Sequence, residues 1–190
     1  MVSSSNAAHR KTQAVSRRRR YVSRCIHFWE SWTTTASNQR PSSIPPADYG
    51  GNIDLRNLTV ESTLFLPVQI EGAGLYIGDP NFAQDNGEVS LTALEASLRA
   101  TLRAQVVPTA EDKRLFGRTD LPFAISHGTL IPMGFSSTLD DALSRSVEHA
   151  INMIAAMFEM PRQQVYLLLS AAIDFNVTQV VDITPKAFTV

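Results

Sequence analysis

The sequence predicts an α+β protein, in which a β-rich, sandwich- or barrel-like portion is followed by a small α/β portion with two helices. Two observations predict this class. Residues 44–110 contain short apolar and β-branched runs interrupted by Pro and Gly. Residues 120–190 contain a long run of apolar residues at helical spacing. We expect the two portions to be connected by residues 108–120, a polar and charged stretch with a central Gly.

The first 43 residues differ from the rest in charge. Residues 1–40 carry eight Lys or Arg and one acidic residue, whereas the rest of the chain carries nine basic and seventeen acidic residues. Because no helical or alternating apolar period is visible, we expect residues 1–43 to be disordered and outside the fold. Three alternatives stay open: the four arginines of 17–20 contact a polyanion, the segment is an organelle-targeting presequence, or it is foreign to the ancestral protein.

The composition excludes several classes of protein. The net charge is −1, and the fractions of apolar (44%) and charged (18%) residues are ordinary for a globular domain. No run approaches the roughly 18 apolar residues of a membrane helix, no secretory h-region is present, and the single Cys25 precludes an intrachain disulfide. We therefore expect a cytoplasmic protein that binds no membrane and, without a base-reading motif, no nucleic acid.

The β-rich portion predicts a hairpin and one further strand. Residues 63–70 and 74–77 have strand composition and are separated by a turn at Glu71 and Gly72. Residues 91–106 are ambiguous, because four leucines suit a helical face while the later residues alternate as in a strand. We favour a strand over 96–107.

The second portion predicts two helices and a final strand. Ser137 or Thr138 can cap the first helix, and two following aspartates suit the positive end of its dipole. The expected core stripe is Leu139, Leu143, Val147, Ala150, Ile151, Ile154 and Phe158. His149 is expected at the edge of this stripe or facing solvent. Pro161 suits the first turn of the second helix, and residues 175–183 are β-branched like a strand.

The stretch GDPNFAQDNGEV, residues 78–89, is the candidate site. Such a cluster of acids and amides can form the lip of a site that holds a metal ion or polarises a carbonyl, and a bound metal ion lowers the pKa of its water. Asp54, Asp79 and Glu88 are candidate acids in glycine-containing, turn-like sequence that lets the backbone approach a ligand. A hydrated turn of Asp and Asn residues is the alternative.

Three segments in order give this candidate a family context. PPADYGGNIDLRNLT, LFLPVQIEGAGLYIGDPNFAQDNGEVSLTALEASLRATLR and LSAAIDFNVTQVVD resemble the acetamidase/formamidase family of amide hydrolases. The resemblance covers about residues 44–190, and the family enzyme is longer. It implies hydrolysis of small linear amides and a divalent metal, zinc or calcium.

The resemblance also implies roles for individual residues. The family pattern GGN-x-D corresponds to residues 50–54, and GD-x-H-x-x-QGDGE corresponds to residues 78–88. It implies metal ligation by Asp54, Asp79 and Glu88, with Glu88 as general base or ligand. Asn52 and Gln84 are expected to orient the substrate or stabilise the oxyanion, so the expected catalytic set is Glu88, Asp79 and Gln84, and the expected substrate-binding set is Asn52 and Asn81.

This chain departs from the family pattern inside the motif. Asn81 replaces a His, Asp85 replaces a Gly, and Asn86 replaces an Asp. An Asn cannot act as a base and is a far weaker zinc ligand than imidazole. Asp85 is expected to strain the turn if its φ is positive. His127 lies two residues from Thr129, near which relatives often carry a His.

Two functional hypotheses follow, with self-association expected in both. The first is an amide hydrolase that binds a small amide substrate. The second is a non-catalytic remnant, or a partner subunit of an amidase, because the motif is altered and the family enzyme is longer. Polyanion binding by the basic tail is a distant third. A chain that represents part of a larger core exposes apolar surface, which favours self-association.

Overall fold

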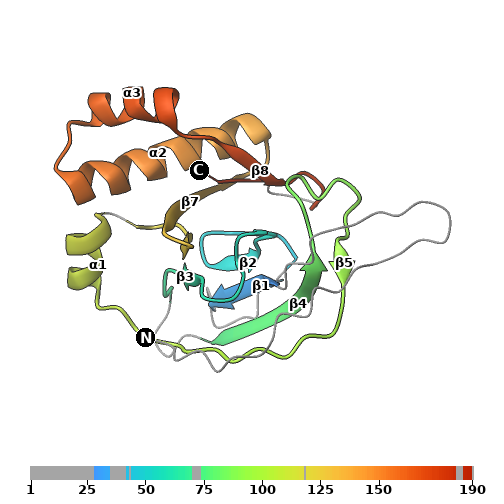
Figure 1. Ribbon diagram of the computed structural model, residues 1–190. Helices are drawn as coiled ribbons and strands as arrows, with labels where there is room; N and C mark the ends of the chain where they lie inside the picture. Colours follow the sequence, from blue (N-terminus) through green and yellow to red (C-terminus); the bar gives the residue numbers. More distant parts are fainter. Residues whose placement is uncertain are drawn as a thin grey trace.

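The computed structural model describes residues 28–34, 42, 44–69, 74–117, 119–182 and 186–189, which form two antiparallel sheets and three helices. The first sheet has the order β2-β1-β4-β5 and the second has the order β3-β6-β7-β9-β8. Figure 1 shows α2 lying against the strands of the second sheet, with α3 packed on α2. The predicted α+β class, with two helices late in the chain, is confirmed.

The bounds of the elements are as follows. The first sheet consists of β2 (Gly50–Asn52), β1 (Phe28–Thr34), β4 (Leu75–Ala83) and β5 (Leu94–Glu95). The second consists of β3 (Thr63–Phe65), β6 (Phe123–Ser126), β7 (Thr129–Ser136), β9 (Lys186–Thr189) and β8 (Asn176–Gln179). The helices are α1 (Thr109–Phe116), α2 (Leu139–Phe158) and α3 (Arg162–Ala172).

Strand β1 corrects the expectation that residues 1–43 lie outside the fold. It is an interior strand of the first sheet and pairs with both β2 and β4. Its sequence, FWESWTT, consists largely of aromatic and β-branched residues that favour strands. The surrounding arginines dominated the charge count and masked this signal. The arginines of 17–20 and Cys25 lie outside the described residues.

Two further strand predictions were wrong. The expected hairpin does not form, because β3 pairs with β6 in one sheet and β4 pairs with β1 and β5 in the other. Its turn at residues 71 and 72 lies outside the described residues. Residues 96–107 form no strand, and most of their side chains are exposed. Their alternation had no partner strand to bury one face against. The connection at 108–120 also contains α1, which was not expected.

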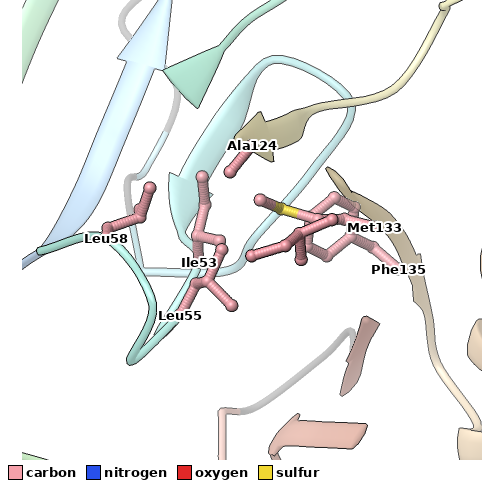
Figure 2. Packing of buried hydrophobic residues seen from close by; sticks show 7 residues of the cluster. Ile53, Leu55, Leu58, Ala124, Met133 and Phe135 are labelled. Atoms are coloured by element: carbon pink, nitrogen blue, oxygen red, sulfur yellow. The ribbon is translucent and has the colours of Figure 1, made fainter. Parts of the chain in front are cut away.

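One hydrophobic core draws on both predicted portions of the chain (Figure 2). Its buried members are Ile53, Leu55, Leu58, Ala124, Ile131, Met133 and Phe135. The first three follow β2, and the others belong to β6 and β7. Residues 44–110 and 120–190 therefore share a core and, through β3 and β6, a sheet. This packing holds the end of β2 in place.

Helix α2 approaches the second sheet closely. A Cβ on Gly134 of β7 would lie 2.4 Å from the Ala142 carbonyl oxygen and 2.4 Å from the Ser146 nitrogen. Thr138 caps the helix by accepting a hydrogen bond from the Asp141 backbone nitrogen, as expected. The side chains that α2 buries include Ala142, Ser146, His149, Ala150 and Met153.

The position of His149 corrects the sequence prediction. Its side chain is buried against the sheet, and its Nδ1 lies 3.0 Å from the Met133 carbonyl oxygen. Phe158, expected in the core stripe, is exposed instead. The helix has two contact faces, one toward β7 and one toward Val165 and Leu169 of α3. A single stripe could not describe both.

Candidate active site

The candidate site is assembled from four segments that are far apart in the sequence. These are residues 52–54 after β2, residues 79–81 of β4, the loop 84–88, and residues 178–182 at the end of β8. The loop is attached to the last segment by backbone bonds: the Gly87 nitrogen donates to the Thr178 oxygen at 3.0 Å, and the Val180 nitrogen donates to the Gly87 oxygen at 3.2 Å. The loop therefore has a fixed position beside β8.

Asn52 holds two of the acids together. Its Nδ2 donates to Asp54 Oδ2 and to Asp182 Oδ2, each at 3.1 Å. A side-chain amide has two N–H donors, so these two bonds occupy both. Asn52 thus orients the acids, and its expected role in substrate binding stays a prediction. Asp54 and Asp182 are buried.

Asp182 was missed by the sequence analysis. Its backbone nitrogen donates to Gln179 Oε1 at 3.1 Å, so the buried Gln179 side chain fixes the turn that presents the carboxylate. Asp182 is the last residue of LSAAIDFNVTQVVD, one of the three segments on which the resemblance rests. We interpreted that segment as the end of a helix followed by a strand and assigned no site residue to it. A lone acid after a β-branched strand gave no distinctive signal in the sequence.

The backbone is left-handed at three of the site acids. The φ angles of Asp54, Asp79 and Glu88 are 51°, 57° and 39°. Such conformations are uncommon for residues other than Gly and cost about 1–2 kcal/mol each. Strained backbone of this kind persists where the surroundings impose it and is concentrated at functional sites. The three acids predicted from the motif therefore share an unusual backbone state.

The acids also perturb one another electrostatically. Burial raises the pKa of the Glu88 carboxyl to about 7; the neighbouring side chains of Asp54 and Gln84 oppose the rise, and the carboxylates of Asp182 and Asp79 add to it. Partial burial raises the pKa of Asp79 as well, with further contributions from Glu95 and Asp182. Carboxyls that lie close together and are partly removed from water disfavour one another's ionised form, so Glu88 keeps its proton to a higher pH than a free glutamate does.

The predicted acids and amides are thus brought together, with their roles still predictions. Asp54, Asp79, Gln84 and Glu88 interact through Glu88. Asn81 lies on β4, two residues beyond Asp79, and is fully buried. His127 lies in the turn between β6 and β7, and its Nε2 is 3.1 Å from Thr59 Oγ1.

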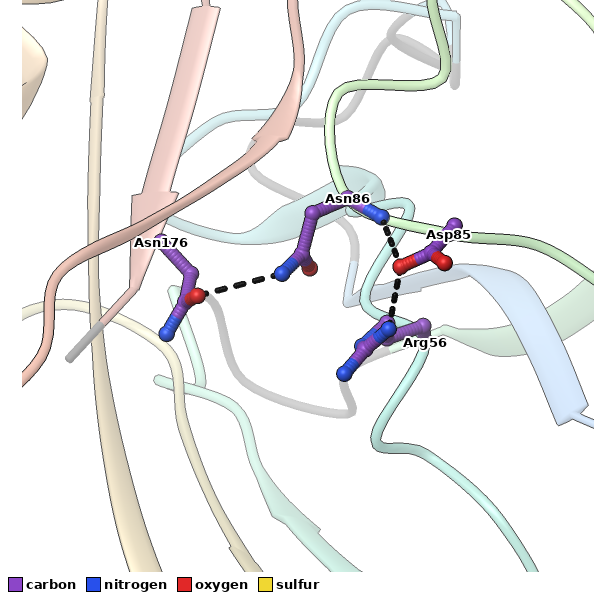
Figure 3. A network of polar contacts seen from close by, with 4 residues as sticks. All are labelled: Arg56, Asp85, Asn86 and Asn176. Carbon is purple, nitrogen blue, oxygen red and sulfur yellow. Dashed lines mark hydrogen bonds and ion pairs between the residues drawn. The ribbon is translucent and has the colours of Figure 1, made fainter.

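The altered motif residues Asp85 and Asn86 have structural roles (Figure 3). Asp85 pairs with Arg56 and accepts a hydrogen bond from the Asn86 backbone nitrogen at 2.8 Å. The Asn86 side chain donates to Asn176 Oδ1 of β8 at 3.1 Å. Asp85 is not among the residues with positive φ, so the expected strain in the turn is wrong. The two residues connect the loop to its neighbours.

The acids in the described residues are not arranged as a metal site. Over the described ranges, no three His, Cys, Asp or Glu side chains are grouped so that they could hold a metal ion. The positions of Asp54, Asp79 and Glu88 therefore do not fit a divalent cation as they stand. We derive no step through a metal, and the zinc or calcium implied by the resemblance stays a prediction.

No helix in the described part of the chain is long and apolar enough to cross a membrane.

The fold and site define a class: an α+β protein in which interacting carboxyls, two of them buried, meet side-chain amides at one site. Comparison with known proteins identifies the family. The Acetamidase/Formamidase family matches residues 11–190, so the chain belongs to the acetamidase/formamidase family. The match begins before residue 44, where we expected the resemblance to start, and it includes β1.

Relatives support this assignment over shorter segments. A formamidase of Methylophilus methylotrophus is 40% identical over 55 residues, 29% of this chain and 14% of that protein. An acetamidase of Mycolicibacterium smegmatis is 43% identical over 54 residues, 28% of this chain and 13% of that protein. These alignments span a small share of each relative.

Solved structures show the same fold. The crystal structure of an acetamidase from Bacillus halodurans aligns with a TM-score of 0.74 and 21% identity, covering 92% of this chain and 57% of that one. The crystal structure of an acetamidase from Yersinia enterocolitica aligns with a TM-score of 0.73 and 21% identity, covering 92% of this chain and 50% of that one. This chain therefore corresponds to about half the length of those proteins.

Proposed function

We propose that this protein hydrolyses the carbon–nitrogen bond of small linear amides, with Glu88 as the acid–base group. The observation that supports this most directly is the pKa of about 7 for Glu88 among three other acids. A carboxyl that titrates near neutral pH can take up and release a proton at working pH. Family membership supplies the reaction class.

In the proposed reaction the Glu88 carboxylate removes a proton from a water molecule. The water oxygen then bonds to the amide carbon, giving a tetrahedral intermediate. Glu88 returns the proton to the amide nitrogen, the carbon–nitrogen bond breaks, and ammonia and a carboxylic acid leave. Gln84, a neighbour of Glu88, orients the water or the substrate in this proposal. Burial, together with the carboxylates of Asp182 and Asp79, keeps the pKa of Glu88 high enough for the return step.

The test is ammonia release from formamide and acetamide by the wild type and by Glu88→Gln. Loss of the acid–base group should lower the turnover number by about 10²–10⁴-fold. Glu61→Gln is the matched control, because Glu61 is an exposed glutamate that also has a left-handed backbone, with φ of 69°. It should retain wild-type turnover. Equal activity of Glu88→Gln and the wild type would contradict the assignment.

A second candidate is a non-catalytic remnant or a partner subunit of an amidase. Two observations favour it: the described acids do not fit a metal ion, and the chain aligns with 57% and 50% of the two solved structures. Metal content of the purified protein, measured together with ammonia release, separates the candidates. Turnover without bound metal supports hydrolysis by the acids alone, and turnover that chelation abolishes supports the predicted ion. Absence of both supports the remnant.

A further inference from the structure

Asn81 carries an unused pair of hydrogen-bonding groups. Its side chain is 0% exposed, and neither Oδ1 nor Nδ2 has a hydrogen-bond partner among the residues that the structure describes. Buried amide groups in native proteins are nearly always paired, because an unpaired group keeps the full cost of leaving water. An amide with both its donor and its acceptor unmet therefore needs a partner that supplies one of each.

Asn81 is positioned beside the acids. It lies on β4, between β1 and β5, opposite Phe28 on one side and Glu95 on the other. Glu95, the residue opposite Asn81, is close enough to Asp79 to raise the pKa of its carboxyl. The chain continues directly from this point into the loop that carries Gln84 and Glu88. The unpaired amide thus belongs to the same site.

We propose that Asn81 binds the substrate's unsubstituted carboxamide through two reciprocal hydrogen bonds. This inference rests on the proposed function and assigns its substrate selectivity. Asn81 Nδ2 donates to the substrate carbonyl oxygen, and the substrate N–H on the same edge donates to Asn81 Oδ1. The first bond polarises the carbonyl that water attacks. Together the two bonds satisfy the group that the unliganded protein leaves unpaired.

This arrangement predicts selectivity for primary amides. In RCONH₂, one N–H and the carbonyl oxygen lie on the same edge, so both bonds form at once. In N-methylacetamide the preferred trans isomer places the N–H on the opposite edge, and the cis isomer costs about 2.5 kcal/mol. A carboxylate offers two acceptors and no donor, so it forms one of the two bonds. The acid product therefore binds more weakly than the substrate and can leave.

The test is to titrate acetamide, N-methylacetamide or acetate into the full-length ¹⁵N-labelled protein and to monitor the resonances by NMR. The Asn81 side-chain NH₂ resonances are identified as the pair that disappears in Asn81→Leu. Acetamide should shift them saturably, while N-methylacetamide and acetate should bind at least tenfold more weakly. Asn81→Leu should weaken acetamide binding at least tenfold, read from the other resonances that shift. Asn152→Leu, which removes an amide that pairs with Arg162 on the helices, is the control and should bind like the wild type.

The unfolding temperature separates a ligand-binding role from a structural one. Leu fills the site without an unpaired polar group, so Asn81→Leu should melt at or above the wild-type temperature while losing acetamide binding. A large drop in melting temperature would mean that Asn81 is needed for the fold, and would overturn the proposal. So would Asn81 resonances that do not move with acetamide, or that move equally with N-methylacetamide.

The inference and the proposed function fail in different ways. Saturable acetamide binding at Asn81 without ammonia release would contradict hydrolysis and leave the recognition intact. Ammonia release with the same KM in Asn81→Leu and in the wild type would contradict the recognition and leave hydrolysis intact.

Discussion

At the residue scale, the site depends on acids that the surrounding protein holds in unfavourable states. Asp54, Asp79 and Glu88 have left-handed backbone, and the pKa of Glu88 is raised. Each feature lowers stability, so the core and the hydrogen bonds of Asn52 and Gln179 must compensate for it. Such a loss of stability is expected at a site selected for reactivity, as we propose for this one.

The buried His149 makes a prediction about stability and pH. Burial lowers the pKa of its imidazole; the Met133 carbonyl and Asp120 oppose the shift, and Arg145 adds to it. As pH falls below about 6.5, the unfolded chain therefore takes up the proton before the folded chain does, and His149 makes folding less favourable. Between pH 7.5 and 5.5, the melting temperature of His149→Gln should fall less than that of the wild type.

The comparison between variants is needed because Glu88 acts in the opposite direction. Its raised pKa means that the folded state holds a proton more readily between pH 4.5 and about 7, so its contribution to stability is largest at low pH and is lost as pH rises. His127→Gln, at an exposed histidine, is the control and should follow the wild type. If the melting temperatures of His149→Gln and the wild type change equally with pH, the prediction is contradicted.

The site acids could be found from the sequence because their chemistry and their motif coincide. Asp182 could not, because a single acid at a strand end has no distinctive spacing. The hydrogen bond from Asn52 to Asp182 joins residues 130 positions apart in the chain. Such a contact follows from the tertiary fold. The bond between Asn86 and Asn176 has the same origin.

At the element scale, the close contact between β7 and α2 positions the helical layer. Gly134→Ala should separate them, because the new Cβ meets backbone atoms that cannot rotate away. We expect a loss of about 1–3 kcal/mol, or several degrees in melting temperature. Gly78→Ala is the matched control, since a Cβ there meets no atom within 4 Å. Equal melting temperatures for the two variants would contradict this account of the packing.

Helices were easier to predict than strands in this protein. The repeat of apolar residues in 139–158 and the cap at Thr138 are local signals, and both helices formed. Strand β1 pairs with strands some 20 and 50 residues away, and β3 pairs with β6 across 60 positions. Strand propensity depends on such partners, so sequence alone misplaced the hairpin and the strand at 96–107.

At the scale of the whole molecule, exposed apolar side chains support the prediction of self-association. On α3, Tyr166 and Leu167 are 60% and 69% exposed, and Phe158 at the end of α2 is 64% exposed. Burying such side chains against a second chain is favourable. Sedimentation velocity at micromolar concentration should show a dimer or a larger species, and Leu167→Glu should shift it toward the monomer. A monomer at all concentrations would contradict the prediction.

The central claim is that Glu88 supplies acid–base catalysis in the hydrolysis of a small amide. The most direct measurement is the pH dependence of kcat/KM for formamide. A base must be ionised, so the rate should rise with pH and reach half its maximum at about pH 7, the pKa of Glu88. Glu88→Gln should be at least about 100-fold slower and should lack this inflection. An unchanged profile in Glu88→Gln, or no ammonia from the wild type at any pH, would contradict the claim.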